Sequence, residues 1–179
     1  FGPRALGNRS ILADPRIKEM QRQLNLKIKF RESFRPFAPA ILEEDLSEWY
    51  EFNTKNEYML TTSHIKNEKR KSEKNEFSNL KGLDLLNIER SEVPSVTHID
   101  YSSRVQSINK ETNKKFHSLV SEFKKITGCP MLVNTSFNLK DEPIVCNPND
   151  AYNCFMSSGL DCLVIENFLL FKNEQSTIV

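Results

Sequence analysis

A long amphipathic segment followed at once by a short apolar run constrains the fold of this chain more than any other feature. From Thr112 to Thr127 apolar side chains recur at the spacing of a helix. Gly128 follows as a natural C-terminal cap, and Pro130 beyond it cannot continue the helix. The apolar run 131–133 then predicts a short buried strand. It delivers Asn134-Thr135-Ser136-Phe137-Asn138 to its carboxyl end, where open α/β sheets bind their ligands.

The other periodic segments mix helical and extended patterns. Helical patterns occur in three further segments, which are 14–25, 43–52 and 148–158. Extended patterns occur in 26–31, 36–42, 58–62, 93–106, 162–165 and 168–171. Asp14 is the expected cap of the first helix, and Leu46 and Trp49 are expected to face inward from the second. We therefore expect one α/β (α+β) domain.

Length and net charge limit the classes of function that this chain can have. With 179 residues the chain is long enough to bury a core in one domain. Its 25 Lys and Arg against 24 Asp and Glu leave a formal charge of +1, so nucleic-acid binding through bulk charge is disfavoured. No apolar run is long enough to cross a membrane. Because the chain opens on Phe1 inside a motif, we expect the N-terminus of the full protein to lie upstream.

The cysteines predict the compartment. None of the four belongs to a CxxC pair, and their neighbours are apolar or strand-like. They are Cys129, Cys146, Cys154 and Cys162. This pattern predicts reduced, buried thiols and no zinc site, and it favours a cytoplasmic protein.

Two cationic stretches indicate an anion site. Arg4 and Arg9 lie among glycines in the first ten residues, and Lys29 to Arg35 forms a second cluster. Lys27, Lys29 and Arg31 would share one face if 26–31 were extended. Glycines let the backbone approach a ligand, and guanidinium groups bind phosphoryl oxygens in a bidentate fork. Each stretch alone could be a solvated surface, but their coincidence with the 134–138 loop favours a phosphate site.

Residues 64–92 predict an exposed insertion. From Lys66 to Lys81 the chain is almost devoid of apolar side chains and rich in Lys, Glu, Asn and Ser. A basic arm for nucleic acid is the alternative interpretation, which the interspersed glutamates make less favourable.

A second polar cluster combines His98, Asp100 and Arg104. We expect Asp100 to cap a turn and His98 to be satisfied within the fold, whereas Arg104 is the better candidate for a ligand contact. No Ser-His-Asp order, HExxH motif or Walker A string occurs. Serine hydrolysis, zinc proteolysis and P-loop nucleotide binding are therefore disfavoured.

Four motifs cover nearly the whole chain in a recognisable order. They are Gly2-Pro3-Arg4-Ala5-Leu6-Gly7-Asn8-Arg9-Ser10, the stretch from Lys29 to Pro39, His98-x-Asp100 with Arg104-x-Gln106, and Asn134 to Asn138 with Glu142-Pro143-Ile144-Val145. Together they resemble the C-terminal domain of the O-carbamoyltransferases of the nodulation and antibiotic-tailoring type. That domain is similar in fold to the YrdC/Sua5 family, which implies a twisted mixed sheet with flanking helices.

The resemblance implies a reaction. Such a domain is understood to take carbamoyl phosphate and ATP, with Mg²⁺ accompanying the nucleotide, and to form carbamoyl adenylate and pyrophosphate. The carbamoyl group then passes to a hydroxyl of an acceptor in a Kae1-like domain, which would lie N-terminal to Phe1 and is absent from this chain. We therefore expect the chain alone to activate the carbamoyl group, or hydrolyse carbamoyl phosphate slowly, without completing the transfer.

The resemblance also implies residue roles. The residues with an implied catalytic role are Lys29, Arg35 and Ser136. The residues implied in substrate or nucleotide binding are Arg4, Arg9, Arg31, Arg104, Asn134 and Asn138. Within this second set Arg9, Arg31 and Asn138 serve either as contacts or as braces, and no metal ligand is expected.

Two alternatives stay open. A YrdC/Sua5-like threonylcarbamoyl-adenylate synthase would depend on threonine and bicarbonate, and the Gly-Pro-Arg-Ala-Leu-Gly opening argues against it. A non-catalytic nucleic-acid-binding module would show RNA binding with a steep salt dependence.

Overall fold

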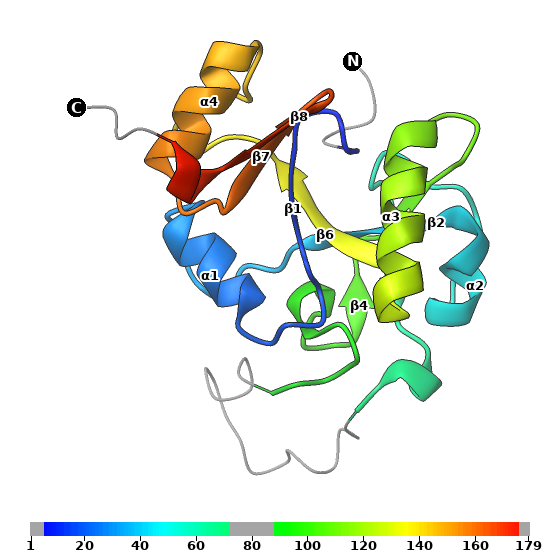
Figure 1. The fold of residues 1–179 in the computed structure, drawn as a ribbon. Coiled ribbons are helices and arrows are strands. Elements are labelled where there is room, and N and C mark those ends of the chain that lie inside the picture. Colours follow the sequence, from blue (N-terminus) through cyan, green and yellow to red (C-terminus); the bar gives the residue numbers. More distant parts are fainter. Residues whose placement is uncertain (1–5, 72–87, 176–179) are drawn as a thin grey trace.

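A four-stranded mixed sheet forms the centre of the computed structural model, which describes residues 6–71 and 88–175 (Figure 1). Its strands, in order across the sheet, are β1 (Ser10–Ala13), β6 (Met131–Ser136), β2 (Ala38–Leu42) and β5 (Gln106–Ile108). Strand β6 runs antiparallel to both β1 and β2, whereas β2 and β5 are parallel. The predicted α+β class with a mixed sheet is confirmed.

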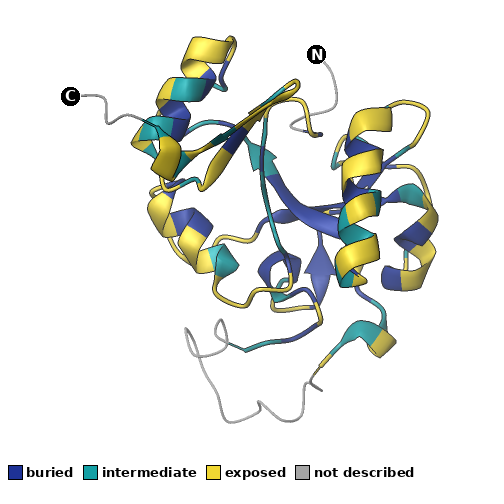
Figure 2. Cartoon of the chain, in the orientation of Figure 1, coloured by how far each residue is buried: buried dark blue, intermediate teal, exposed yellow. Residues whose placement is uncertain are grey.

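The described residues form four α-helices around this sheet. They are α1 (Met20–Lys27), α2 (Leu46–Trp49), α3 (Lys114–Thr127) and α4 (Pro148–Ser157). Figure 2 shows dark blue, buried strands in the interior and yellow, exposed outer faces on the helices.

Both faces of the sheet are covered, which explains why its two central strands are apolar. Every residue of β2 is buried, as are the first four residues of β6. Successive residues of β6 enter different cores because side chains alternate across a strand. Leu132 packs in a cluster with Phe116 of α3, whereas Met131 packs in a larger cluster with Leu24 of α1.

Helix α3 and its ends agree with the sequence prediction. The Asn113 side chain accepts a hydrogen bond from Phe116 N, and Gly128 closes the helix with a φ of +75°. The apolar stripe of this helix is only partly buried, however. Leu119 and Ile126 remain 52% and 84% exposed, because they lie off the line that faces the sheet.

The predicted structure of the N-terminal part needs two corrections. Helix α1 begins at Met20 and not after Asp14, because the Asp14 carboxylate accepts hydrogen bonds from the backbone and side chain of Arg16. Residues 26–31 do not form an extended segment. The helix continues to Lys27, and the chain then turns at Phe30 with a φ of +45°.

The middle of the chain agrees in part. Helix α2 buries Leu46 and Trp49 as predicted. The strand predicted at 58–62 is wrong, since β3 covers Ser63–His64 and pairs with β4 (Ser102–Ser103). The extended stretch predicted at 93–106 is interrupted by a 3-10 turn at Pro94–Val96 before β4.

The predicted insertion at 64–92 is anchored in the fold at both ends. Ile65 and Ser91 are fully buried, and Arg70 forms an isolated β-bridge with Ser91. The described ends of this segment are therefore structural, which corrects the predicted boundaries. Residues 72–87 lie outside the described residues.

The C-terminal part confirms the extended segments predicted at 162–165 and 168–171 and corrects the prediction for the cysteines. Strands β7 (Cys162–Ile165) and β8 (Phe168–Phe171) pair antiparallel. All four cysteines are free, but only Cys129 and Cys154 are buried, whereas Cys146 and Cys162 are exposed. No helix in the described ranges has the length and apolarity needed to traverse a lipid bilayer.

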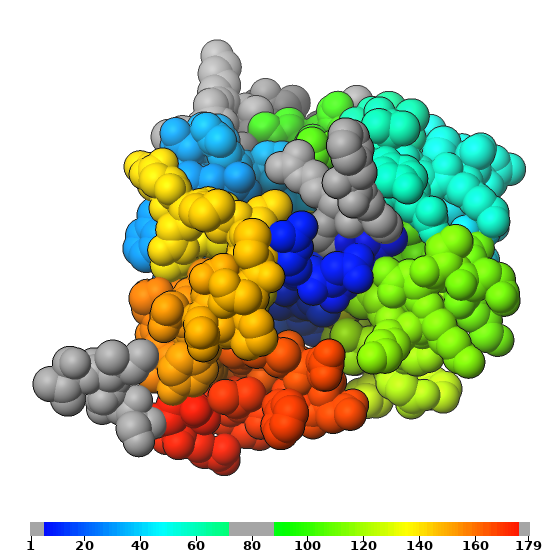
Figure 3. All heavy atoms as spheres, turned by 90° about the horizontal axis from the view of Figure 1, so that it is seen from above, coloured from blue at the N-terminus to red at the C-terminus, as the bar shows by residue number. Residues whose placement is uncertain are grey.

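The N-terminal segment enters the fold between two distant parts of the sequence. Viewed from above, its blue residues lie between the yellow and orange region that follows β6 and green α3 (Figure 3). Gly7 makes this approach possible, because a Cβ at this position would stand 2.6 Å from Phe116 Cγ. Its φ of +75° also favours glycine.

Candidate anion-binding cavity

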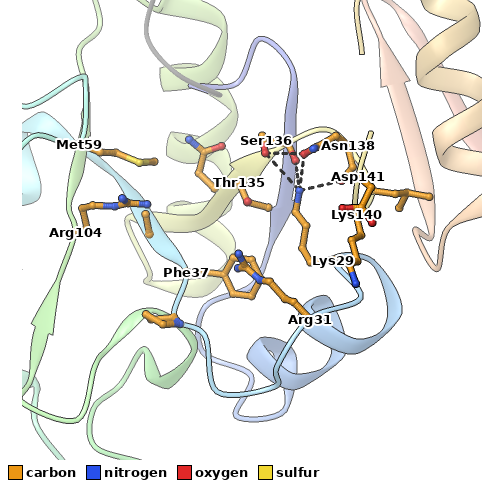
Figure 4. Close-up of a pocket in the computed structure, with 14 residues that line it drawn as sticks. Lys29, Arg31, Phe37, Met59, Arg104, Thr135, Ser136, Asn138, Lys140 and Asp141 are labelled. Carbon is orange, nitrogen blue, oxygen red and sulfur yellow. Dashed lines mark hydrogen bonds between the residues drawn. The ribbon is translucent and has the colours of Figure 1, made fainter. Parts of the chain in front are cut away.

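A cavity of about 280 Å³ opens beside the carboxyl end of β6, where the sequence places its polar loop. Its walls come from the turn after α1, from the start of β2, from the loop after β6, and from Met59 and Arg104 (Figure 4). This volume lies near the small end of the range for ligand pockets. It suits a small phosphorylated compound, or the phosphate groups of a nucleotide, rather than an enclosed nucleotide.

The Lys29 ammonium holds the loop after β6. Its Nζ lies 2.6 Å from Ser136 O, 2.9 Å from Asn138 O and 2.9 Å from Asn138 Oδ1 (Figure 4). The Ser136 hydroxyl donates to the same Asn138 Oδ1 at 2.7 Å, and Asn138 Nδ2 donates to Glu142 O. The three side chains predicted as site residues therefore form one network. In this arrangement the network braces the loop, because its donors already point to oxygens of the chain.

Asn25 explains why Lys29 reaches this position. Its buried amide donates to the carbonyl oxygens of Ser33 and Arg35, and its Oδ1 accepts a 2.6 Å hydrogen bond from Arg31 Nε. This amide folds the segment after α1 into a compact turn. Lys29 is thereby only 8% exposed, although a lysine on a regular amphipathic strand would reach solvent.

The remaining cations at the cavity are better placed for a ligand. Arg31 stacks its guanidinium 4.9 Å from the centre of the Phe37 ring, and burial together with the nearby charge of Arg35 lowers its pKa. Arg104 and Lys140 are exposed and line the same cavity. Within residues 6–71 and 88–175 neither of these two forms an ion pair. The cavity therefore has a local excess of positive charge.

Asn134 forms the buried part of the cavity lining. Its Nδ2 donates to Gln106 Oε1 at 2.6 Å, and Gln106 Nε2 donates to the carbonyl oxygen of Glu57 at 2.7 Å. The residue is 1% exposed. Strand β6 thus contributes Asn134 and Ser136 to the cavity on the face that also carries Leu132, as the two-residue period of a strand requires.

Other predicted site residues lie elsewhere. Arg35 forms an exposed ion pair with Glu32 at 2.9 Å and does not line the cavity. Arg9 donates to Val145 O at 3.2 Å, so it braces the far end of the loop after β6. Arg4 lies outside the described residues.

Within the cluster of His98, Asp100 and Arg104, the expected role of Asp100 in a turn is confirmed. Asp100 accepts a 2.9 Å hydrogen bond from Ser102 N. Hydrogen bonding from the side chain and the backbone of Ser102 lowers the pKa of the Asp100 carboxyl group. Burial lowers the pKa of His98, which favours a neutral imidazole. Only Arg104 lines the cavity.

Sequence reasoning missed several cavity residues. Those that line it without having been predicted include Phe37, Met59, Thr135, Lys140 and Asp141. Lys140 could have been inferred, because it follows the polar loop directly. Met59 gave no usable signal, because its turn, with a φ of +56°, depends on contacts between distant segments.

The donor set gives little support for a metal held by the protein alone. No group of three or more metal-ligating side chains occurs in the part of the chain that the structure describes. Asp141 is the one carboxylate among the described cavity-lining residues. A single carboxylate next to phosphate oxygens fits Mg²⁺ that arrives with a nucleotide, because Mg²⁺ is commonly bound in this way.

A comparison with known protein families identifies the family of this chain. The profile described as "Carbamoyltransferase C-terminus" matches residues 1–172, almost the full chain. The chain belongs to this family. The family assignment agrees with the resemblance of the motifs.

Individual relatives agree. The chain is 50% identical over 175 residues to the uncharacterized protein sll1178 of Synechocystis, with 98% of this chain and 28% of that protein covered. It is 39% identical over 176 residues to nodulation protein NolO of Bradyrhizobium diazoefficiens, covering 98% of this chain and 29% of NolO. With MJ1058 of Methanocaldococcus jannaschii the identity is 36% over 170 residues, covering 95% and 25%. The chain thus spans about a quarter of the length of these relatives.

Proposed function

We propose that this chain is the carbamoyl-activating domain of an O-carbamoyltransferase and that it binds carbamoyl phosphate and ATP at the cavity beside β6. The observation that carries the proposal is the group of Arg31, Arg104 and Lys140 around a cavity whose loop is already braced by Lys29. Phosphate groups of both substrates would supply negative charge to balance these cations. Membership of the carbamoyltransferase family supports the choice of substrate class.

The proposed reaction has two balanced steps. Water first cleaves carbamoyl phosphate into carbamate and phosphate, with one proton released to solvent. A carbamate oxygen then attacks the α-phosphorus of ATP, and the new C–O–P linkage of carbamoyl adenylate forms as pyrophosphate leaves with the bonding electrons. Mg²⁺ bound with the nucleotide would neutralise part of the phosphate charge. The chain's own part is to position the anions and neutralise their charge, without a covalent nucleophile.

The contacts refine the roles that the resemblance implies. We assign Arg31, Arg104 and Lys140 to phosphate oxygens, because these cationic residues line the cavity. We assign Lys29 and Ser136 to holding the loop, because both donate to Asn138 Oδ1. This assignment predicts that Ser136 supplies shape and polarity to the site and does not attack the substrate.

Transfer to an acceptor is proposed to require more than this chain. The relatives are more than three times as long as this chain, and the resemblance implies a Kae1-like domain that holds the acceptor. We expect the complete protein, expressed in the cytoplasm, to carbamoylate a hydroxyl of a small molecule.

Calorimetry on the 179-residue chain with Mg²⁺ tests the site. Carbamoyl phosphate and ATP should both bind, and Arg104→Ala and Lys140→Ala should each weaken binding about tenfold or more through the loss of a charge-assisted hydrogen bond. Lys115→Ala removes an equal charge from an exposed position on α3 outside the cavity and is the matched control. Unchanged affinity in both cavity variants would overturn the proposed site, and a requirement for threonine and bicarbonate would favour the synthase instead.

A further inference from the structure

One buried acceptor beside the cavity is left without a partner. Asn134 Oδ1 is shielded from solvent and accepts no hydrogen bond within the described ranges. It lies on the central strand of the sheet, between Leu12 of β1 and Ala38 of β2 in the strand register. An apolar side chain here would avoid the cost of an unsatisfied amide, so the retained asparagine calls for an explanation in terms of function.

The orientation of this amide is set from outside the cavity. The Glu57 carbonyl oxygen can only accept, so Gln106 must present its Nε2 to Glu57 and its Oε1 to Asn134. Asn134 must then turn its Nδ2 to Gln106. The chain of two amides therefore leaves Oδ1, a pure acceptor, as the atom of the Asn134 amide without a hydrogen-bond partner.

We infer that Asn134 Oδ1 recognises the amino group of the carbamoyl moiety and so selects carbamoyl compounds over other acyl phosphates. This inference rests on the proposed function. The amino group of carbamoyl phosphate, of carbamate and of carbamoyl adenylate is conjugated with its carbonyl and acts only as a donor. Acetyl phosphate has the same shape and charge but carries a methyl group there, which would leave Oδ1 unsatisfied. A site that contains a buried polar group rejects ligands that cannot pair with it.

Two neighbouring side chains bear on the access of such a group to Oδ1. Ala38 is the partner of Asn134 in strand β2 and contributes only a methyl group to the cavity lining. Because Oδ1 is shielded in the ligand-free arrangement, contact requires a side chain in the wall to move. Met59 lies beside Arg104 at the cavity (Figure 4), and an unbranched thioether side chain adapts its shape readily.

Selectivity between two acyl phosphates tests this inference. Calorimetry on the 179-residue chain would compare freshly dissolved carbamoyl phosphate, acetyl phosphate and inorganic phosphate in the cold. The wild-type chain should prefer carbamoyl phosphate to acetyl phosphate about tenfold, as expected for one hydrogen bond to an otherwise orphaned acceptor. Asn134→Ala should remove this preference while inorganic phosphate still binds. Asn153→Ala, at an exposed position of α4, is the matched control.

A second variant keeps the test valid if Asn134→Ala unfolds. The double variant Gln106→Leu with Asn134→Leu replaces both partners of the buried pair by apolar groups of similar size, which preserves stability better than removing one partner. It should also lose the preference. Equal binding of both acyl phosphates by the wild-type chain, or a preference that survives in a folded variant, would overturn the role of Asn134 and leave the proposed function standing. Absence of binding by every phosphate compound would overturn both.

Discussion

Replacing Lys29 by methionine tests whether this lysine braces the loop or contacts a ligand. Methionine keeps most of the apolar stem and removes the ammonium group. The backbone carbonyl oxygens of Ser136 and Asn138, now 2.6 and 2.9 Å from Nζ, would lose their charged donor, as would Asn138 Oδ1.

The structure gives the size of the effect. A hydrogen bond from a charged donor contributes about 1.5–3 kcal/mol when the acceptor is buried. Ser136 and Asn138 are only half-buried, so water can replace part of what is lost. We therefore expect the free energy of unfolding to fall by about 2–4 kcal/mol, which corresponds to a decrease in Tm of roughly 4–16 °C for a chain of this size.

Urea and thermal denaturation of the 179-residue chain measure this effect. Arg35→Met is the matched control, because it removes a cation from the same segment whose ion pair with Glu32 is 54% exposed on both sides. Its stability should change much less than that of Lys29→Met, because an exposed ion pair contributes little to stability. If Lys29→Met were as stable as Arg35→Met and yet failed to bind substrate, the lysine would be a ligand contact and the bracing role would be refuted.

Three further predictions concern packing, pH and thiol reactivity. Gly7→Ala should lower the free energy of unfolding by about 2–3 kcal/mol in urea titrations, because its Cβ would stand 2.6 Å from Phe116 Cγ and its φ is +75°. A variant as stable as the wild-type chain would contradict the packing described. Burial lowers the pKa of His98 below its ordinary 6.5, so stability should fall as the pH drops from 7 towards 5, and His98→Gln should flatten that decline in denaturation curves. Burial raises the pKa of Cys129 to about 11. Alkylation at pH 8, followed by mass spectrometry, should therefore label the exposed Cys146 long before Cys129. Equal labelling rates of the two thiols would argue against the assigned burial.

The sequence correctly predicted the elements that are determined by residues within a single segment. Helix α3 is correct because Gly128 and the apolar spacing act within one segment, and the extended segments that form β7 and β8 are correct because their patterns are also local. The start of α1 was missed because Asp14 pairs with Arg16 instead of capping a helix. The alternation in 26–31 was misleading, because hydrogen bonds from Asn25 fold that segment into a turn.

The candidate site was predictable in its chemistry and less so in its geometry. The sequence predicted Lys29, Ser136 and Asn138 as polar site residues, and the structure places them in one hydrogen-bond network. The Lys29 ammonium donates its hydrogen bonds to oxygens of the chain itself. Residue spacing could not predict this, because the contact joins residues more than a hundred positions apart. Arg35 belongs to the same cationic stretch as Lys29 and Arg31, but it forms an ion pair with Glu32. Only the tertiary structure reveals this difference.

Release of pyrophosphate by the 179-residue chain tests the central claim most directly. With ATP, Mg²⁺ and carbamoyl phosphate, pyrophosphate should form only when all three are present, and Arg104→Ala should suppress it while Lys115→Ala does not. Mass spectrometry of the same mixture should detect carbamoyl adenylate. Substrate binding without any pyrophosphate, or pyrophosphate formed in the absence of carbamoyl phosphate, would contradict carbamoyl activation at this cavity.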